Sequence, residues 1–280
     1  MLGRTRSMIP FGQSWSIAQA AGLATLLEAS APKYGNVHPS ACFDDMHFGH
    51  FVASAAVQQS CFESIGSSVG DLVLRTVRET RYRVGRNTNL GTVLLLAPLA
   101  IAANAIEAEE LGHATLAAVT ARVLGDLTAQ DSSLVYEAIR VASPGGLGQQ
   151  SENDVSSAVA PESLVAAMQQ VAEVDSVARQ YTNGFVEVFD PLLGWLDEEL
   201  SKQADPLIAI QRFQLRCLAW QPDGLIIRKC GFDQAVKVQQ MAKELHHRCV
   251  QSDPNSEVNS RQFDQYLRAD RNRRNPGTTR

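Results

Sequence analysis

Apolar and polar side chains follow one another along most of the chain with the period of an α-helix. From Ile17 to Leu27, for example, apolar residues recur every three or four positions. Ser14 or Ser16 can cap this first helix, and Pro32 ends it. The same pattern predicts helices over residues 44–65, 69–82, 92–108, 114–124, 128–143, 161–181, 185–203, 206–219, 232–250 and 257–272.

Patterns typical of β-strands are nearly missing from the sequence. Residues 225–227, Leu-Ile-Ile, form a short β-like run that is too isolated to build a sheet. Aromatic residues make up only 6% of the chain, whereas Ala and Leu, which favour helices, are abundant. We therefore predict an all-α fold, a single multi-helix bundle.

The predicted bundle extends over residues 1–280 as one domain. Residues 149–160 are the candidate linker, but the helices on either side of them have similar composition. We expect this polar segment to be a flexible loop and the C-terminal residues to form a polar tail. Segments rich in Pro, Gly and Asn interrupt the helices, and we expect them to form a phosphate-binding cleft.

The overall charge and the cysteines limit the classes of partner. The net charge of −5 gives no basic field that would favour nucleic acid. The most apolar stretch, residues 93–103, is too short to span a bilayer and contains Pro98. Five cysteines without a CxxC pair indicate free thiols, and the N-terminus lacks the apolar core of a signal peptide. We expect a cytoplasmic protein that binds neither nucleic acid nor membrane, with a homodimer as a possible assembly.

Standard signatures of nucleotide-binding and hydrolytic enzymes do not occur in the sequence. It has no Walker A loop, no Gly-rich dinucleotide motif and no HExxH. An all-helical protein that binds phosphates without them must use helix N-termini, basic side chains and carboxylate-held metal.

Residues 44–50, Asp-Asp-Met-His-Phe-Gly-His, are the densest group of metal-binding side chains. Asp44 and Asp45 can hold Mg²⁺ that also bridges substrate phosphates, because hard cations prefer oxygen ligands. Asp44, His47 and His50 recur every third residue on the predicted helix and suit zinc or iron instead. A third interpretation is structural, with the acids favouring a helix start and the histidines lying on the surface.

Two helix-breaking segments carry candidate substrate contacts. Lys33 lies in a loop bounded by Pro and Gly and is either a phosphate contact or a solvated lysine. Asn87, Thr88 and Asn89 precede the most apolar predicted helix. One of them can cap that helix, yet two amides flanking a threonine exceed what a cap requires, so we interpret the segment as a ligand contact.

Two further breaks give weaker signals. Gly145 and Gly146 have bare backbone amides available to an anion, although Gly after a helix is also the commonest C-cap. Asp223, Arg228 and Lys229 follow a proline in another break. The two cations can bind phosphate or pair with the carboxylate.

In this order, four of these segments resemble motifs of the triphosphoribosyl-dephospho-CoA synthase family. Residues 28–37, Glu-Ala-Ser-Ala-Pro-Lys-Tyr-Gly-Asn-Val, are similar to the family's Glu followed by Pro-Lys-Pro-Gly. Residues 43–46, Phe-Asp-Asp-Met, resemble its Asp-Met helix start, and residues 87–91, Asn-Thr-Asn-Leu-Gly, its Asn-Thr-His-Lys-Gly. Residues 222–229 look like its Asp-to-Arg segment near the C-terminus. The resemblance extends over residues 20–235.

The resemblance implies an all-α enzyme that transfers the triphosphoribosyl group of ATP to 3′-dephospho-CoA and releases adenine. Displacement at a sugar carbon needs cations or Mg²⁺ for the triphosphate and carboxylates for the developing positive charge and the attacking hydroxyl. By position, Lys33 and Arg228 would bind phosphate, Asp44 and Asp45 would hold metal, Asn87 and Asn89 would orient the nucleotide, and Glu28 would be a second carboxylate.

The sequence also departs from the family's motifs. Tyr34 replaces the second Pro of Pro-Lys-Pro-Gly, and Asn89 and Leu90 replace His-Lys. Residues 144–148, Pro-Gly-Gly-Leu-Gly, stand where better-known members have a segment of the type Gly-Arg-Gly-Glu. These changes indicate a divergent branch that keeps nucleotide binding and can use another acceptor, for example in tetrahydromethanopterin-linked one-carbon metabolism. A non-catalytic helical nucleotide-binding or assembly protein is the remaining alternative.

Overall fold

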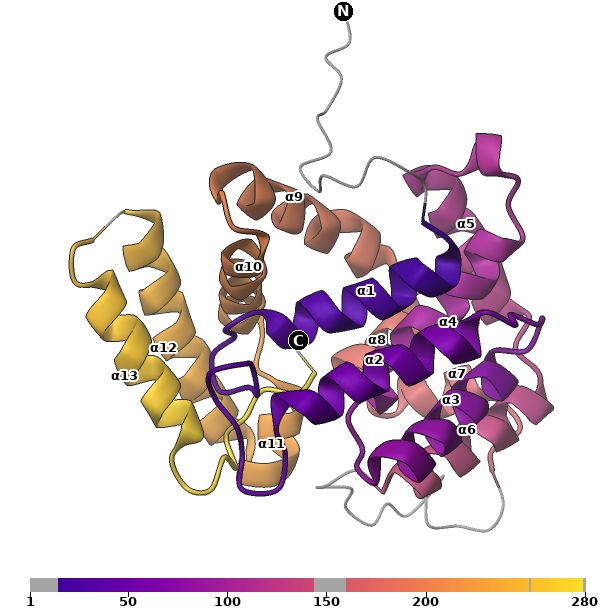
Figure 1. Ribbon diagram of the computed structural model, residues 1–280, viewed down its shortest axis with the longest axis horizontal. Coiled ribbons are helices and arrows are strands. Elements are labelled where there is room, and N and C mark those ends of the chain that lie inside the picture. Colours follow the sequence, from indigo (N-terminus) through magenta and orange to yellow (C-terminus); the bar gives the residue numbers. More distant parts are fainter. Residues whose placement is uncertain (1–14, 144–159, 252, 279–280) are drawn as a thin grey trace, which may run out of the picture.

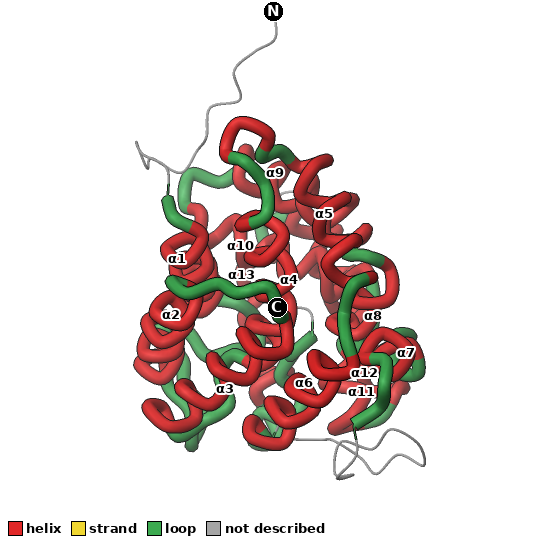
Figure 2. The backbone as a smooth tube through the Cα atoms, turned by 90° about the vertical axis from the view of Figure 1, so that its right-hand side faces the viewer, coloured by secondary structure: helices red, strands yellow, loops and turns green. Residues whose placement is uncertain are grey.

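The computed structural model describes residues 15–143, 160–251 and 253–278. Within these ranges the chain forms thirteen α-helices and no sheet, which confirms the all-α prediction (Figures 1 and 2). Isolated β-bridges between His38 and Ala41 and between Phe43 and Met46 tighten two turns of the long loop before the second helix. None of the helices in the described ranges combines the length and the apolar character that a membrane span requires.

Eight helices form the first part of the fold. They are α1 (Ile17–Ser30), α2 (Phe48–Phe62), α3 (Val69–Val84), α4 (Leu90–Asn104), α5 (His113–Gly125), α6 (Ala129–Ala142), α7 (Leu164–Gln169) and α8 (Ser176–Asn183). Helix α1 packs against α2, and α3 packs against α2, α4 and α6. Their apolar faces share one hydrophobic cluster, in which Val73, Val93 and Val135 are completely buried. Burial of these side chains is the main force that holds this part together.

Five helices complete the fold: α9 (Leu193–Lys202), α10 (Pro206–Trp220), α11 (Gly224–Cys230), α12 (Phe232–Val250) and α13 (Ser256–Arg268). Helix α12 packs against α10, α11 and α13, and Figure 1 shows α12 and α13 at the opposite end of the molecule from α3 and α6. A second hydrophobic cluster lies here and includes Tyr34 from the loop after α1. Because α1 contacts both α4 and α10, it connects the two parts, and one domain stays our prediction.

Capping residues place several helix starts where the sequence predicts them. Ser16, not Ser14, caps α1: its hydroxyl accepts from Gln19 N, and the Gln19 side chain accepts in return from Ser16 N. Thr128 and Asp131 form the same reciprocal arrangement at α6. Helix α4 is a core helix as predicted, and it accommodates Pro98 in its interior.

Four predicted elements differ from those observed. The helix predicted over 185–203 becomes a regular α-helix, α9, only at Leu193, because the non-helical Asp190 and Pro191 interrupt it. The helix predicted over 44–65 begins only at Phe48, because the preceding residues close the bridged turn between Phe43 and Met46. The helix predicted over 161–181 is two helices, since side chains of Ser163 and Asp175 each cap a separate start. The β-like residues 225–227 are helical in α11, where Asp223 supplies the cap.

Candidate active site

A cleft of about 1060 Å³ is lined by segments from both parts of the fold, and we call it the main cleft. Pockets that hold a drug-sized molecule typically measure about 300–1,000 Å³, so the main cleft is large enough for a nucleotide. Its lining includes nine of the residues predicted from the sequence: Glu28, Lys33, Asp44, Asp45, Asn87, Thr88, Asn89, Arg228 and Lys229.

The charge of the main cleft differs from that of the whole chain. The chain has 30 acidic and 25 basic residues, whereas cations outnumber acids among the described residues that line the cleft. A concave surface with an excess of cations concentrates anionic ligands. The cationic lining residues are Lys33, Arg81, Arg86, Arg228, Lys229 and Arg271, and the acidic ones are Glu28, Asp44, Asp45 and Asp175.

Lys33 is buried in the wall of the main cleft, with only 1% of its surface exposed. Its ammonium forms a salt bridge with the carboxylate of Glu28, which lies in the last turn of α1 and keeps 23% of its side chain exposed. Burying an ammonium is costly unless it is paired, so the carboxylate compensates much of the charge. The alternative of a solvated Lys33 is therefore wrong.

Tyr34 fixes the loop that carries Lys33. Its backbone N–H donates to Gln214 Oε1 over 2.9 Å, and its carbonyl accepts from Gln214 Nε2 over 3.1 Å. Its ring meets Phe263 edge-on with centroids 5.5 Å apart, and its hydroxyl contacts Ser260 Oγ at 3.1 Å. A proline here would lack the donor that Gln214 binds. The departure from Pro-Lys-Pro-Gly thus replaces a rigid ring by an anchor to α10 and α13.

The sequence pattern predicts Asp44 and Asp45 on a helix, but in the structure both lie in the turn before α2. Both are exposed at the main cleft, and Asp45 Oδ2 accepts from Arg86 Nη1 over 3.3 Å. Mg²⁺ at phosphate sites typically takes one or two protein carboxylates and completes its shell with phosphate oxygens and water. Two adjacent exposed carboxylates beside a cationic cleft fit that requirement.

The histidines of the same segment do not complete a transition-metal site. His47 caps α2, and its backbone N–H donates to His50 Nδ1 over 3.1 Å, so that nitrogen is occupied. Partial burial, then the nearby His47 and Arg86, lower the pKa of His50. In the described ranges no three His, Cys, Asp or Glu side chains are arranged to hold a metal ion. The zinc or iron interpretation, which needs Asp44, His47 and His50 together, is therefore wrong.

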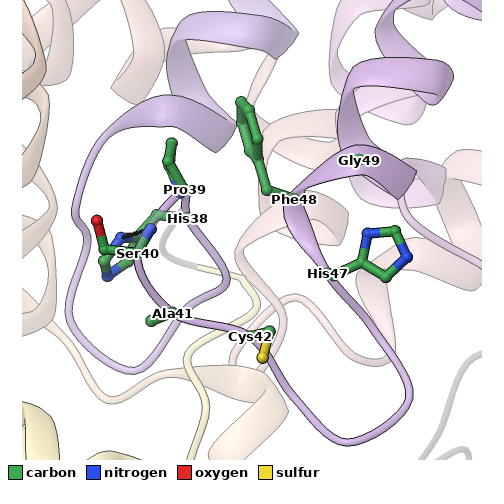
Figure 3. Close-up of a pocket in the computed structure, with 8 residues that line it drawn as sticks. All are labelled: His38, Pro39, Ser40, Ala41, Cys42, His47, Phe48 and Gly49. Atoms are coloured by element: carbon green, nitrogen blue, oxygen red, sulfur yellow. Dashed lines mark hydrogen bonds between the residues drawn. The ribbon is translucent and has the colours of Figure 1, made fainter.

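A smaller pocket of about 390 Å³ lies beside this segment and is lined by residues 38–42 and 47–49. Figure 3 shows His38 and His47 on opposite sides of it, with Cys42 between them on the loop. His38 Nδ1 accepts from the backbone N–H of Ser40 over 3.3 Å. The separation of the histidines leaves this pocket without a convergent set of catalytic groups.

The segment 87–89 forms one wall of the main cleft and also organises the start of α4. The Asn89 side chain donates from Nδ2 to Thr80 Oγ1 over 3.0 Å, and Thr88 contacts the hydroxyl of Ser54. Asn87 Oδ1 accepts from Leu90 N over 3.3 Å. Thr88 and Asn89 are 6% and 3% exposed. Asn89 is the N-cap residue by position but its side chain makes no capping bond, so its amide serves the contact with α3.

Asp223 does not line the main cleft. It is 1% exposed and caps α11, with Oδ1 accepting from Leu225 N and Ile226 N over 2.9 and 3.0 Å. Its Oδ2 accepts from Gly277 N and Thr278 N over 3.0 and 2.9 Å. Both oxygens thus hold the backbone in place, and the carboxylate positions α11 and the C-terminal segment for the cleft.

Arg228 and Lys229 lie in the last turn of α11 and face the main cleft. The Arg228 guanidinium pairs with Asp175, whose other oxygen caps α8. Lys229 Nζ donates to Asn275 Oδ1 over 3.0 Å. Both cations are therefore held in position by neighbours from α8 and the C-terminal segment. The acid that pairs with Arg228 is Asp175, at the start of α8.

Several lining residues could not be identified from the sequence. Asp175 lies inside what the periodicity predicts to be one continuous helix, and Asn275 lies in the presumed polar tail. Asn36 was part of the motif around Lys33 but carried no role of its own. Apolar side chains of α4, α6 and α7 line the other side of the cleft: Leu94, Leu95, Leu96, Ile139, Leu164 and Met168. The predicted anion contacts Gly145 and Gly146 lie outside the described residues.

Comparison with known proteins shows the family. A family model described as CitG, ATP:dephospho-CoA triphosphoribosyl transferase, matches residues 14–279. The chain belongs to this family. ATP:dephospho-CoA triphosphoribosyl transferases are enzymes, which confirms the prediction of a transferase that uses ATP and dephospho-CoA. A search of curated proteins found no significant match.

A solved structure supports the fold assigned to this triphosphoribosyl transferase. It is a crystal structure of a protein from Archaeoglobus fulgidus, provisionally described as a triphosphoribosyl-dephospho-CoA synthase. The two chains are 24% identical and superimpose with a TM-score of 0.53 over 78% of this chain and 96% of the other. This likeness shows a common fold.

Proposed function

We propose that the main cleft binds ATP and dephospho-CoA together and catalyses the transfer through the residues predicted from the sequence. The observation that carries the proposal is their convergence. Side chains from α1, the turn at 43–46, the segment 87–89 and α11 line one cavity that has an excess of cations and a volume at the upper end of the range for ligand pockets.

The triphosphate of ATP would lie against Lys33, Arg228 and Lys229. Lys33 and Arg228 each have a carboxylate neighbour, and Lys229 is bonded to Asn275, so none of these cations is free to swing away. Preorganised cations bind a phosphate at a smaller entropic cost than flexible ones. Asn87 and Asn89 would orient the nucleotide from the neighbouring wall.

Asp44 and Asp45 would hold Mg²⁺ at the exposed side of the cleft. The metal would supply positive charge to the triphosphate and complete its coordination with phosphate oxygens and water. Arg86, which pairs with Asp45, keeps that carboxylate beside the cleft. This arrangement explains why two exposed acids stand in a cleft whose other charges favour an anion.

The transfer itself needs a group that accepts a proton and stabilises positive charge. The 2′-hydroxyl oxygen of dephospho-CoA forms a bond to C1′ of the ATP ribose, and the C1′–N9 bond breaks with its electron pair leaving on adenine. Glu28 would accept the hydroxyl proton and stabilise the positive charge that develops on the sugar. Its position on the cleft side of buried Lys33 keeps the carboxylate oriented.

Adenine release tests the proposal. The protein is incubated with ATP, Mg²⁺ and dephospho-CoA, and adenine is measured by chromatography. Lys33→Met and Glu28→Gln should each lower the rate about 100-fold or more, because each removes one charge that acts in the transition state. Wild-type protein that releases no adenine while an active family member does so in parallel would refute the proposal.

Thermal unfolding in the presence of each ligand tests whether the acceptor differs. ATP that raises the melting temperature while dephospho-CoA does not would favour a related transferase with another alcohol acceptor, such as a pterin-linked one. Retention of full cellular function by Lys33→Met would instead favour a non-catalytic role.

A further inference from the structure

Asn36 lines the main cleft and has a buried hydrogen-bond donor that is unused among the described residues. It follows Lys33 in the loop after α1 and lines the cleft with it. Its side chain is buried, with 6% of the residue exposed, and Nδ2 has no hydrogen-bond partner among the described residues. A buried amide donor without an acceptor is unfavourable and calls for an explanation.

The backbone of Asn36 is firmly held. Its N–H donates to the carbonyl of Lys33 over 3.3 Å, and its own carbonyl accepts from Arg268 Nη2 over 2.6 Å. The neighbouring Gly35, at φ 71°, donates to Asp264 Oδ1 over 2.7 Å. The unused donor is therefore not a product of a loose loop, because α13 fixes the loop on both sides of the residue.

The surroundings indicate which acceptor the amide would take. Lys33 from the same loop lies in the same wall, and the cleft as a whole has an excess of cations. An oxygen that carries negative charge is favoured here over a neutral one. The terminal torsion of an asparagine is soft, so an arriving oxygen can draw the amide toward itself.

We propose that Asn36 donates a hydrogen bond from Nδ2 to an oxygen of the triphosphate of ATP, next to Lys33. This inference rests on the proposed function and adds a substrate-binding residue to it. Lys33 would then attract the triphosphate by its charge, and the Asn36 amide would orient it by a directional hydrogen bond.

The test is calorimetric binding of inorganic tripolyphosphate in the presence of Mg²⁺. Asn36→Leu, which has nearly the same size without the donor, should weaken binding about tenfold, and Asn36→Asp about 100-fold, because its carboxylate also repels phosphate. In steady-state assays both variants should raise KM for ATP and leave KM for dephospho-CoA unchanged.

Asn259→Leu is a matched control. Asn259 lies on α13, and its Nδ2 is likewise buried without a partner, but it does not line the main cleft. This variant should bind tripolyphosphate like the wild type. Without ligand, Asn36→Leu should melt at or above the wild-type temperature, because it removes a buried donor that nothing satisfies.

Two results would overturn the inference. One is a folded Asn36→Leu protein with wild-type affinity for tripolyphosphate. The other is equal weakening by Asn36→Leu and Asn259→Leu, which would indicate a general effect on the fold. Failure of the proposed function is a separate result: tripolyphosphate would bind in an Asn36-dependent manner while ATP and dephospho-CoA release no adenine.

Discussion

The start of α11 and the turn at 43–46 contain acids that look alike in the sequence and behave differently in the structure. Asp223 is buried, and both its oxygens accept from backbone N–H groups of α11 and the C-terminal segment. Asp44 and Asp45 are exposed at the main cleft, and Arg86 is the partner of Asp45.

The contrast separates two uses of a carboxylate. An acid whose oxygens are all occupied by the fold stabilises that fold and has little capacity left for a ligand. An acid exposed at a cleft keeps the capacity to bind a cation or a substrate, at little gain in stability. The variants below test this distinction, beginning with the largest expected effect.

Replacing Asp223 should destabilise the protein strongly. Asp223→Ala removes the cap of α11 and the acceptor for Gly277 and Thr278, and leaves several backbone donors unsatisfied. We expect the free energy of unfolding to fall by about 3 kcal/mol in urea titrations. Asp205→Ala is the control, because this exposed cap of α10 should cost only about 1 kcal/mol. Equal losses in the two variants would contradict the structural role of Asp223.

Replacing Asp45 should lower the rate of the reaction strongly and leave the stability almost unchanged. Asp45→Asn keeps the size of the side chain and removes the charge, so the rate of adenine release should fall about 100-fold, comparable to about 2.7 kcal/mol. The free energy of unfolding should change by less than about 0.5 kcal/mol. Glu257→Gln, which replaces another exposed acid, on α13, should leave both quantities unchanged. A loss of stability equal to that of Asp223→Ala would contradict the distinction between acids that stabilise the fold and acids that are available to a ligand.

Asp131 extends the comparison to a second buried acid and to pH. Burial alone raises its pKa, but hydrogen bonds from Gly70, Thr128 and Ser68 outweigh burial and lower the pKa below the ordinary value. A lowered pKa contributes stability that is present above the pKa of the unfolded chain, about 3.9, and is lost as pH falls through the folded value.

Asp131→Asn should therefore cost about 2 kcal/mol at neutral pH, and the difference from wild type should shrink below pH 4. Thermal unfolding between pH 7 and pH 2.5 measures it. Asp71→Asn on α3 is the control, since this acid is exposed and its variant should behave like the wild type. A difference that stays constant down to pH 2.5 would rule out ionised Asp131 as the link between α3 and α6.

Helices whose signals are local could be predicted from the sequence. The start of α6 follows from its Thr128 cap, and the start of α12 at Phe232 follows from the apolar period; both signals need only neighbours in the chain. The errors arose where a turn or a second cap interrupts a pattern that could continue. Residues 44–47 have helix-compatible composition, yet the bridge at 43–46 delays α2.

Some of the residues that line the main cleft could also be predicted from the sequence. Glu28, Lys33, Asp44, Asp45 and the segment 87–89 were singled out by motif order, and the structure brings them together. Asp175, Asn36 and Asn275 had no pattern that marks them, because each acquires its place through contacts with distant residues. Asp223 had the right motif but a different role.

The sequence by itself determined which residues are chemically able to bind a triphosphate and that they must be carried by helices. Only the tertiary structure decided which of them face one cavity and which have their hydrogen-bonding atoms already paired within the fold. The physical reason is that burial and hydrogen-bond occupancy depend on partners far away in the chain. The backbone N–H groups of Gly277 and Thr278 donate to the carboxylate of Asp223, while Asp44 and Asp45 remain exposed at the cleft.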